Sequence, residues 1–86
     1  MTKQNKLRSR FLSKPSDFTF DEMKKLLNGF GYQEVRTGKT SGSRVAFINR
    51  ERHHIIRLHK PHPDNILKKY QLDLIEEELK NQEILI

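Results

Sequence analysis

The sequence predicts an α+β fold in the order helix, strand, strand, strand, helix, with a three-stranded antiparallel sheet and both helices on one of its faces. Three observations support this prediction. Apolar residues recur at helical spacing between residues 19 and 30, and again between residues 67 and 79. Between these segments, apolar and polar residues alternate on either side of a polar turn, as they do in a β-hairpin.

The first helix is predicted to begin at a capping box. Thr19 and Glu22 have the spacing at which each side chain bonds the other residue's backbone N–H. The apolar residues that follow at helical spacing are Phe20, Met23, Leu26, Leu27 and Phe30. Gly29 and Gly31 offer left-handed positions at the carboxyl end, so the helix is expected to stop there.

Three short strands are predicted next, over residues 32–36, 43–49 and 53–59. A two-residue turn between the last two would place Arg44 opposite Arg57 and Phe47 opposite His54. In this register one face of the hairpin is apolar and suits packing on helices, whereas the other is mixed and basic. The apolar face consists of Val45, Phe47, Ile56 and Leu58.

The last helix is predicted to follow a proline-rich turn. Pro61 and Pro63 end the third strand, since proline cannot donate to a ladder. The helix starts at Asp64 or Lys68 and runs to about Asn81, and its buried stripe is Leu67, Leu72, Ile75 and Leu79. The apolar tail at 84–86 is expected to pack back on the domain. The whole order is that of a double-stranded-RNA-binding (dsRBD-like) domain.

The composition predicts a small cytoplasmic domain with an anionic partner. The chain has 86 residues, no cysteine and a formal net charge of +6, and nucleic acid is the commonest large anion. Residues 1–17 are expected to be a flexible basic arm, and residues 18–86 the folded domain. No signal peptide and no membrane span is recognisable, so no membrane partner is expected.

No metal, small-molecule cofactor or phosphate-binding loop is expected. Gly38-Lys39-Thr40 resembles the end of such a loop, but the motif requires glycine where this chain has Gln33. His53 and His54 are adjacent in a predicted strand and would point to opposite faces, so they cannot easily share an ion. His54 falls on the core face and is interpreted as a hydrogen-bonded histidine at the core edge.

Basic residues gather on the open face of the predicted hairpin. Arg44 opposite Arg57 is unfavourable unless an anion lies between them, and His59 is diagonal to Arg44 on the same face. A solvated face with screened repulsion is the alternative. Lys60, Lys68 and Lys69 lie near the start of the last helix, where phosphates are favoured.

These residues resemble the HicA toxins of bacterial HicA/HicB toxin–antitoxin pairs over roughly residues 19–81. The matching residues are Gly31-Tyr32, Arg36, Gly42-Ser43, Phe47, Leu58-His59-Lys60-Pro61-His62-Pro63, Leu67-Lys68, Leu72 and Ile75. The resemblance implies a cytoplasmic ribonuclease that cleaves mRNA, is toxic when free and is neutralised by a HicB-type antitoxin. The family's usual Gly-Ser-His places a catalytic histidine where this chain has Arg44, and the loop before Gly42 is longer here.

This departure leaves three hypotheses. In the first, the domain cleaves RNA without a metal: Arg44 cannot be a base but can stabilise transition-state charge, and either His59 or His62 takes the 2′-hydroxyl proton. In the second, it only binds RNA. In the third, Ala46, Ile48 and Ile55 on the open face bind a protein. The residues expected to bind RNA are Arg36, Arg44, Arg57, Lys60, Lys68 and Lys69.

Overall fold

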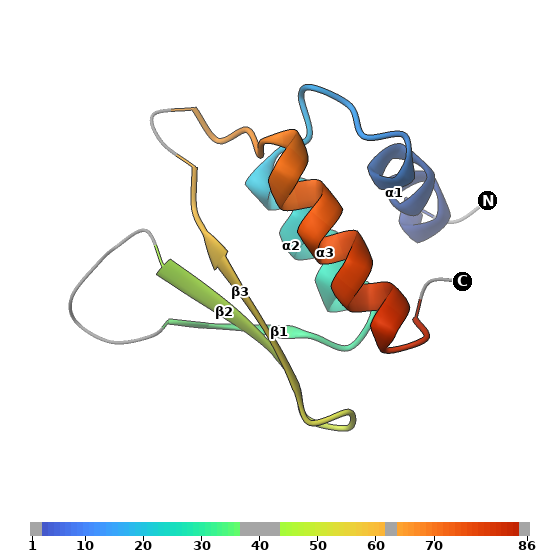
Figure 1. The fold of residues 1–86 in the computed structure, drawn as a ribbon, viewed down its shortest axis with the longest axis vertical. Coiled ribbons are helices and arrows are strands. Elements are labelled where there is room, and N and C mark those ends of the chain that lie inside the picture. Colours follow the sequence, from blue (N-terminus) through green and yellow to red (C-terminus); the bar gives the residue numbers. More distant parts are fainter. Residues whose placement is uncertain (1–2, 37–43, 62–63, 85–86) are drawn as a thin grey trace.

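The computed structural model describes residues 3–36, 44–61 and 64–84. Its elements are α1 (Lys3–Leu12), α2 (Phe20–Gly29), β1 (Gln33–Arg36), β2 (Arg44–Asn49), β3 (His54–His59) and α3 (Lys69–Asn81). The strands form one antiparallel sheet in the order β1-β2-β3. As Figure 1 shows, α2 and α3 form a layer on one face of the sheet, and α1 lies at the side of that layer away from the strands. The predicted fold class is confirmed, with one additional helix.

The start and end of α2 match the sequence prediction. The Glu22 N–H donates to Thr19 Oγ1 at 3.1 Å, and the Thr19 N–H donates to Glu22 Oε1 at 3.0 Å, so the capping box is complete. The helix ends at Gly29, and Gly31 adopts a left-handed φ of +95°. A Cβ at Gly31 would lie 3.3 Å from Asn49 Nδ2, so both the backbone angle and the space favour glycine there.

The predicted hairpin register is wrong by two residues. Arg44 pairs with His59, and Ala46 pairs with Arg57. The turn spans residues 50–53 instead of two residues, because His53 adopts a left-handed φ of +52° and Asn49 Oδ1 accepts the Arg52 N–H at 3.1 Å. A shift of two residues leaves every side chain on its predicted face. The apolar face is therefore buried as predicted, with Val45, Phe47, Ile56 and Leu58 all in the core.

The last helix begins at Lys69, and Lys68 is its N-cap residue. Gln71 fixes this end: its Oε1 accepts the Lys68 N–H at 3.0 Å, and its Nε2 donates to the His59 carbonyl at 3.2 Å. The predicted stripe of Leu67, Leu72, Ile75 and Leu79 is buried. Ile84 packs partly buried against the core, whereas residues 85 and 86 of the predicted tail lie outside the described residues.

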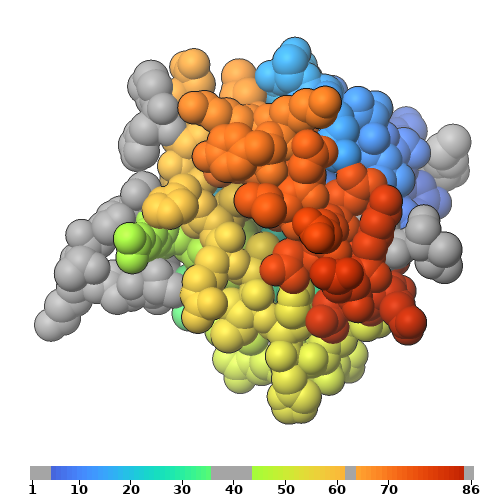
Figure 2. All heavy atoms as spheres, in the orientation of Figure 1, coloured from blue at the N-terminus to red at the C-terminus, as the bar shows by residue number. Residues whose placement is uncertain are grey.

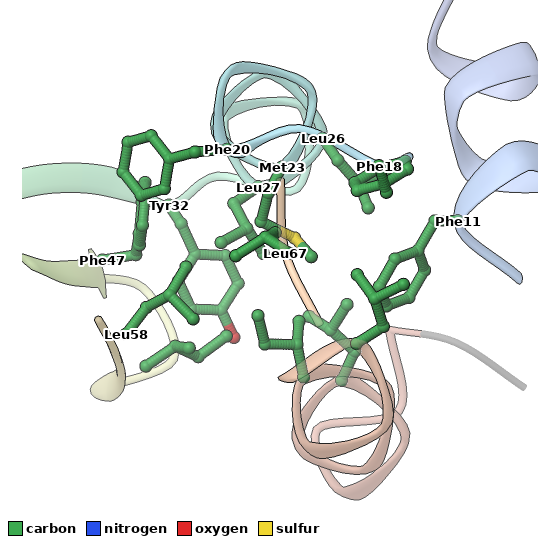
Figure 3. Close-up of a cluster of buried hydrophobic side chains, with 14 of the residues drawn as sticks. Phe11, Phe18, Phe20, Met23, Leu26, Leu27, Tyr32, Phe47, Leu58 and Leu67 are labelled. Atoms are coloured by element: carbon green, nitrogen blue, oxygen red, sulfur yellow. The ribbon is translucent and has the colours of Figure 1, made fainter. Parts of the chain in front are cut away.

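The core extends further than the sequence predicts. The predicted members are buried except Phe30, which is only partly buried against the cluster. Figure 3 shows Phe11 and Phe18 on one side of this core, with Phe20, Tyr32 and Phe47 on the other. The buried apolar residues outside the predicted helix stripes and the predicted sheet face are Phe11, Phe18, Tyr32 and Ala46.

The sequence predicts a flexible basic arm over residues 1–17, whereas in the structure residues 3–12 form the helix α1. Phe11 is completely buried, and its ring centroid lies 5.7 Å from that of Phe18. Two cations of this segment are ion-paired within the fold. Arg10 Nε lies 2.6 Å from Glu22 Oε2, and Lys14 bonds Glu76 as well as Asp73 Oδ1, the latter at 2.9 Å. These side chains join the N-terminal segment to α2 and α3.

Candidate functional site

Most of the residues predicted to act on RNA meet at one end of the sheet. At this end β1 stops at Arg36, β2 starts at Arg44, and β3 stops at His59. The hydrogen bond from Gln71 to the His59 carbonyl brings the start of α3 to the same place. The structure thus gathers Arg36, Arg44, His59, Lys60, Lys68 and Lys69 at this end of the molecule.

On the open face of the sheet, Arg44 lies directly opposite His59. Side chains opposite one another in an antiparallel pair have Cβ atoms about 4.5–5.5 Å apart, so one phosphate can contact both. The predicted opposition of Arg44 and Arg57 is wrong: Arg57 pairs with Ala46, diagonal to Arg44. Arg44, Arg57 and His59 nevertheless share one face, and all three are exposed.

These three residues form no ion pair with any residue that the structure describes. Arg10 and Lys14 of the N-terminal segment differ in this respect, since both are paired with carboxylates. Positive charge on the open face is therefore available to a ligand. An exposed cationic face of this kind attracts polyanions and is weakened by salt.

The lysines lie beside this face, after the end of β3 and at the start of α3. Lys60 Nζ is 5.6 Å from the centroid of the Phe20 ring, so its ammonium group is held near the start of α2. Lys68 and Lys69, which cap and begin α3, are exposed. Among the described residues none of these lysines takes part in an ion pair, although Lys69 helps to lower the pKa of Asp73 one turn further along α3.

A hollow of about 470 Å³ lies beside the junction of β3 and α3. His59, Lys60 and Lys68 line it together with Ile66 and Tyr70. In Figure 2 the orange segment that begins α3 is exposed on the surface beside the yellow end of β3. Sequence reasoning missed Tyr70. The available signal was that Tyr70 directly follows two lysines and falls outside the helical spacing of the buried residues.

Two predicted features lie outside the described residues: the candidate base His62, and the loop that contains Gly42-Ser43. The role of His62 therefore stays a prediction. Arg36 is described as the last residue of β1, where it pairs with Val45, one position along β2 from Arg44.

His54 is a hydrogen-bonded histidine at the core edge, as predicted. Its Nδ1 lies 2.7 Å from Tyr32 Oη, and its Nε2 lies 3.0 Å from Glu78 Oε2. With both ring nitrogens engaged, His54 is poorly suited to accept a proton from a substrate. Burial raises the pKa of the Tyr32 hydroxyl, which keeps it protonated.

No group of three His, Cys, Asp or Glu side chains able to hold a metal ion occurs in the described part of the chain. In the same residues, no helix has the length and apolar character needed to cross a membrane.

A family model described as the HicA toxin of bacterial toxin–antitoxin systems matches residues 20–82. The matched region runs from the first residue of α2 to the residue after α3, so it includes the whole sheet but not α1. No curated protein and no solved structure matched the chain.

Proposed function

This chain belongs to the HicA family of bacterial toxins, and we propose that it is an RNA-binding toxin domain that acts on mRNA. Its RNA-binding surface is the open-face end of the sheet around Arg44, Arg57 and His59. Lys60, Lys68 and Lys69 extend this surface toward α3. The partner that neutralises it is an antitoxin of the HicB type, and its place of action is the cytoplasm, where mRNA is found.

One observation carries the proposal: Arg44 lies opposite His59, both are exposed, and neither is ion-paired with a described residue. Cleavage of RNA without a metal requires a base for the 2′-hydroxyl and a cation for the charge that develops on the phosphate. A histidine suits the first role. Arginine, which stays protonated, suits the second.

In the proposed reaction His59 removes the proton of a 2′-hydroxyl. The 2′ oxygen then attacks the adjacent phosphorus, and the bond from phosphorus to the 5′ oxygen breaks. The departing oxygen takes a proton from water, and the other product ends in a 2′,3′-cyclic phosphate. Arg44 stabilises the negative charge on the phosphate oxygens during this step.

A second candidate function is RNA binding without cleavage. The observation that favours it is Arg44 itself, which occupies the position of the histidine in the Gly-Ser-His usual in the family. The third hypothesis, protein binding through the apolar residues of the open face, has less support. Ala46 is only 4% exposed and Ile48 is partly buried, so Ile55 is the one strongly exposed member of that set.

The test is the growth of cells that express the domain, together with cleavage of mRNA by the purified protein. Wild type is expected to arrest growth and cut RNA, and His59→Ala is expected to lose both activities. His53→Asn is the matched control, because His53 is an exposed histidine in the hairpin turn and asparagine tolerates its left-handed backbone. Cleavage at the wild-type rate by His59→Ala would show that another group is the base. Tight RNA binding without any cleavage would favour the second candidate.

A further inference from the structure

The hollow between β3 and α3 combines apolar and cationic walls. Its volume of about 470 Å³ falls in the range of pockets that hold small organic groups. Tyr70 and Ile66 supply apolar surface, Lys60 and Lys68 supply positive charge, and Asp64 contributes one carboxylate. The combination fits a planar group attached to an anion.

Tyr70 is the most exposed of the large hydrophobic side chains in the described part of the chain, at 60%. It lies in the first turn of α3, outside the buried stripe of that helix, so its ring contributes little to the core. Ile66, on another wall of the same hollow, is also exposed. Proteins that bind single-stranded nucleic acids use exposed aromatic rings beside cations. The bases stack on the rings, and the phosphates lie near the cations.

Hydrogen bonds hold the walls of the hollow in place. The Phe20 N–H donates to the Asn65 carbonyl and the Leu67 N–H donates to the Phe18 carbonyl, both at 2.8 Å. These bonds attach the segment around Ile66 to the start of α2. Gln71, nearly buried, joins β3 to α3 at the base of the hollow. A preformed site loses little conformational entropy when it binds a ligand.

The hollow is continuous with the proposed RNA surface, because His59 both lines the hollow and lies opposite Arg44. We propose that it is a nucleobase subsite, in which one unpaired base of the RNA stacks on Tyr70 while Lys60 and Lys68 contact the flanking phosphates. This inference rests on the proposed function. It adds that the RNA is bound as a single strand, since both faces of a base within a duplex are already covered by its neighbours.

The fluorescence of tyrosine offers a direct test. The chain contains two tyrosines and no tryptophan, and Tyr32 is 1% exposed, so a base that stacks on a tyrosine can reach Tyr70 alone. The probe is a 2′-O-methyl oligonucleotide, which resists cleavage by a 2′-hydroxyl. Its binding is expected to quench the emission of wild type and to leave that of Tyr70→Phe unchanged. Tyr70→Phe should bind with nearly wild-type affinity, because phenylalanine still stacks.

Affinity gives the second readout. Tyr70→Ala is expected to bind the single strand about 5- to 150-fold more weakly, the loss that corresponds to one base–aromatic stack. A duplex of the same sequence should be bound equally by wild type and Tyr70→Ala. Leu74→Ala is the matched control, because Leu74 is exposed on the same helix but does not line the hollow. It should bind like wild type.

The outcomes separate this inference from the proposed function. Salt-sensitive binding of the single strand, with unquenched emission and no effect of Tyr70→Ala, would overturn the base subsite and leave the RNA surface intact. In that case a protein contact would be the remaining role for the exposed ring. A wild-type protein that binds no RNA would overturn both proposals.

Discussion

Phe11 of α1 packs against Phe18, with their ring centroids 5.7 Å apart, and this contact joins the N-terminal helix to the chain just before α2. Both rings are completely buried. Truncation of a fully buried phenylalanine costs about 3–5 kcal/mol, a large part of the stability of a small domain. We therefore expect Phe11→Ala to lower the free energy of unfolding by about that amount in urea denaturation.

The neighbouring Leu12 provides the control, because its side chain is 42% exposed. Leu12→Ala should change the free energy of unfolding by less than about 0.5 kcal/mol, as is usual for surface positions. Equal small losses in both variants would mean that α1 does not contribute to the core.

Stability should fall in acid because of the ion pairs of Lys14. Hydrogen bonds from Lys14 are the largest cause of the lowered pKa values of Glu76 and Asp73. A carboxyl group whose pKa is lowered by folding stabilises the protein fully above its unfolded pKa, and that contribution is lost as the pH falls through the folded value. The unfolded chain takes up these protons first, so the urea midpoint should decrease as the pH falls below the ordinary values of 4.5 and 3.8.

Lys14→Met should make this acid-induced decrease smaller, because the two carboxyl groups then keep pKa values nearer those of the unfolded chain. The matched variant is Lys25→Met, at an exposed lysine of α2 that has no ion pair among the described residues. Its decrease should equal that of wild type. The same acid response in both variants would contradict the role assigned to Lys14.

The faces of the sheet could be predicted from the sequence, but the pairing of its strands could not. Alternation with a period of two places Phe47 and Ile56 in the core whether or not the register shifts by two residues. The register depends on the length of the turn, which follows from the left-handed backbone of His53 and the side-chain bond of Asn49. No periodic pattern carries this information, so Arg44 was matched with the wrong partner.

The N-terminal helix and the hollow were missed for a related reason. Among the described side chains of α1, only Leu7 and Phe11 reach the core cluster, so its local pattern is that of a polar, basic segment. Tertiary contacts, not helix propensity, stabilise most helices of this length. The hollow beside Tyr70 likewise depends on where the end of β3 meets α3, which the spacing within either element does not determine.

If RNA is bound through phosphate contacts, its affinity should fall with salt, and each arginine that contacts a phosphate should contribute to the slope. For single strands, the slope of log affinity against log salt changes by about 0.7 for each phosphate contact. Arg57→Ala should therefore flatten the slope by about 0.7. Arg50→Ala makes the same change in net charge, but Arg50 is exposed in the hairpin turn at the opposite end of the sheet. It should leave the slope unchanged, whereas equal effects of both variants would indicate that net charge alone matters.

In the proposed cleavage reaction, Arg44 should set the rate. If Arg44 stabilises charge in the transition state, Arg44→Ala should lower the cleavage rate on the order of a hundredfold, as the loss of one such donor does elsewhere. RNA affinity should fall much less, because Arg57 and the lysines near α3 remain.

Arg44→His is the sharper variant, because it restores the histidine usual in the family opposite His59. Two histidines across one strand pair can divide the work, one as base for the 2′-hydroxyl and the other as acid for the departing 5′ oxygen. Arg44→His should therefore cut RNA faster than wild type and arrest growth more strongly. The additional substitution His59→Ala should remove this gain, whereas His53→Asn should not. A rate for Arg44→His no higher than that of Arg44→Ala would mean that the surroundings of position 44 cannot support a catalytic histidine.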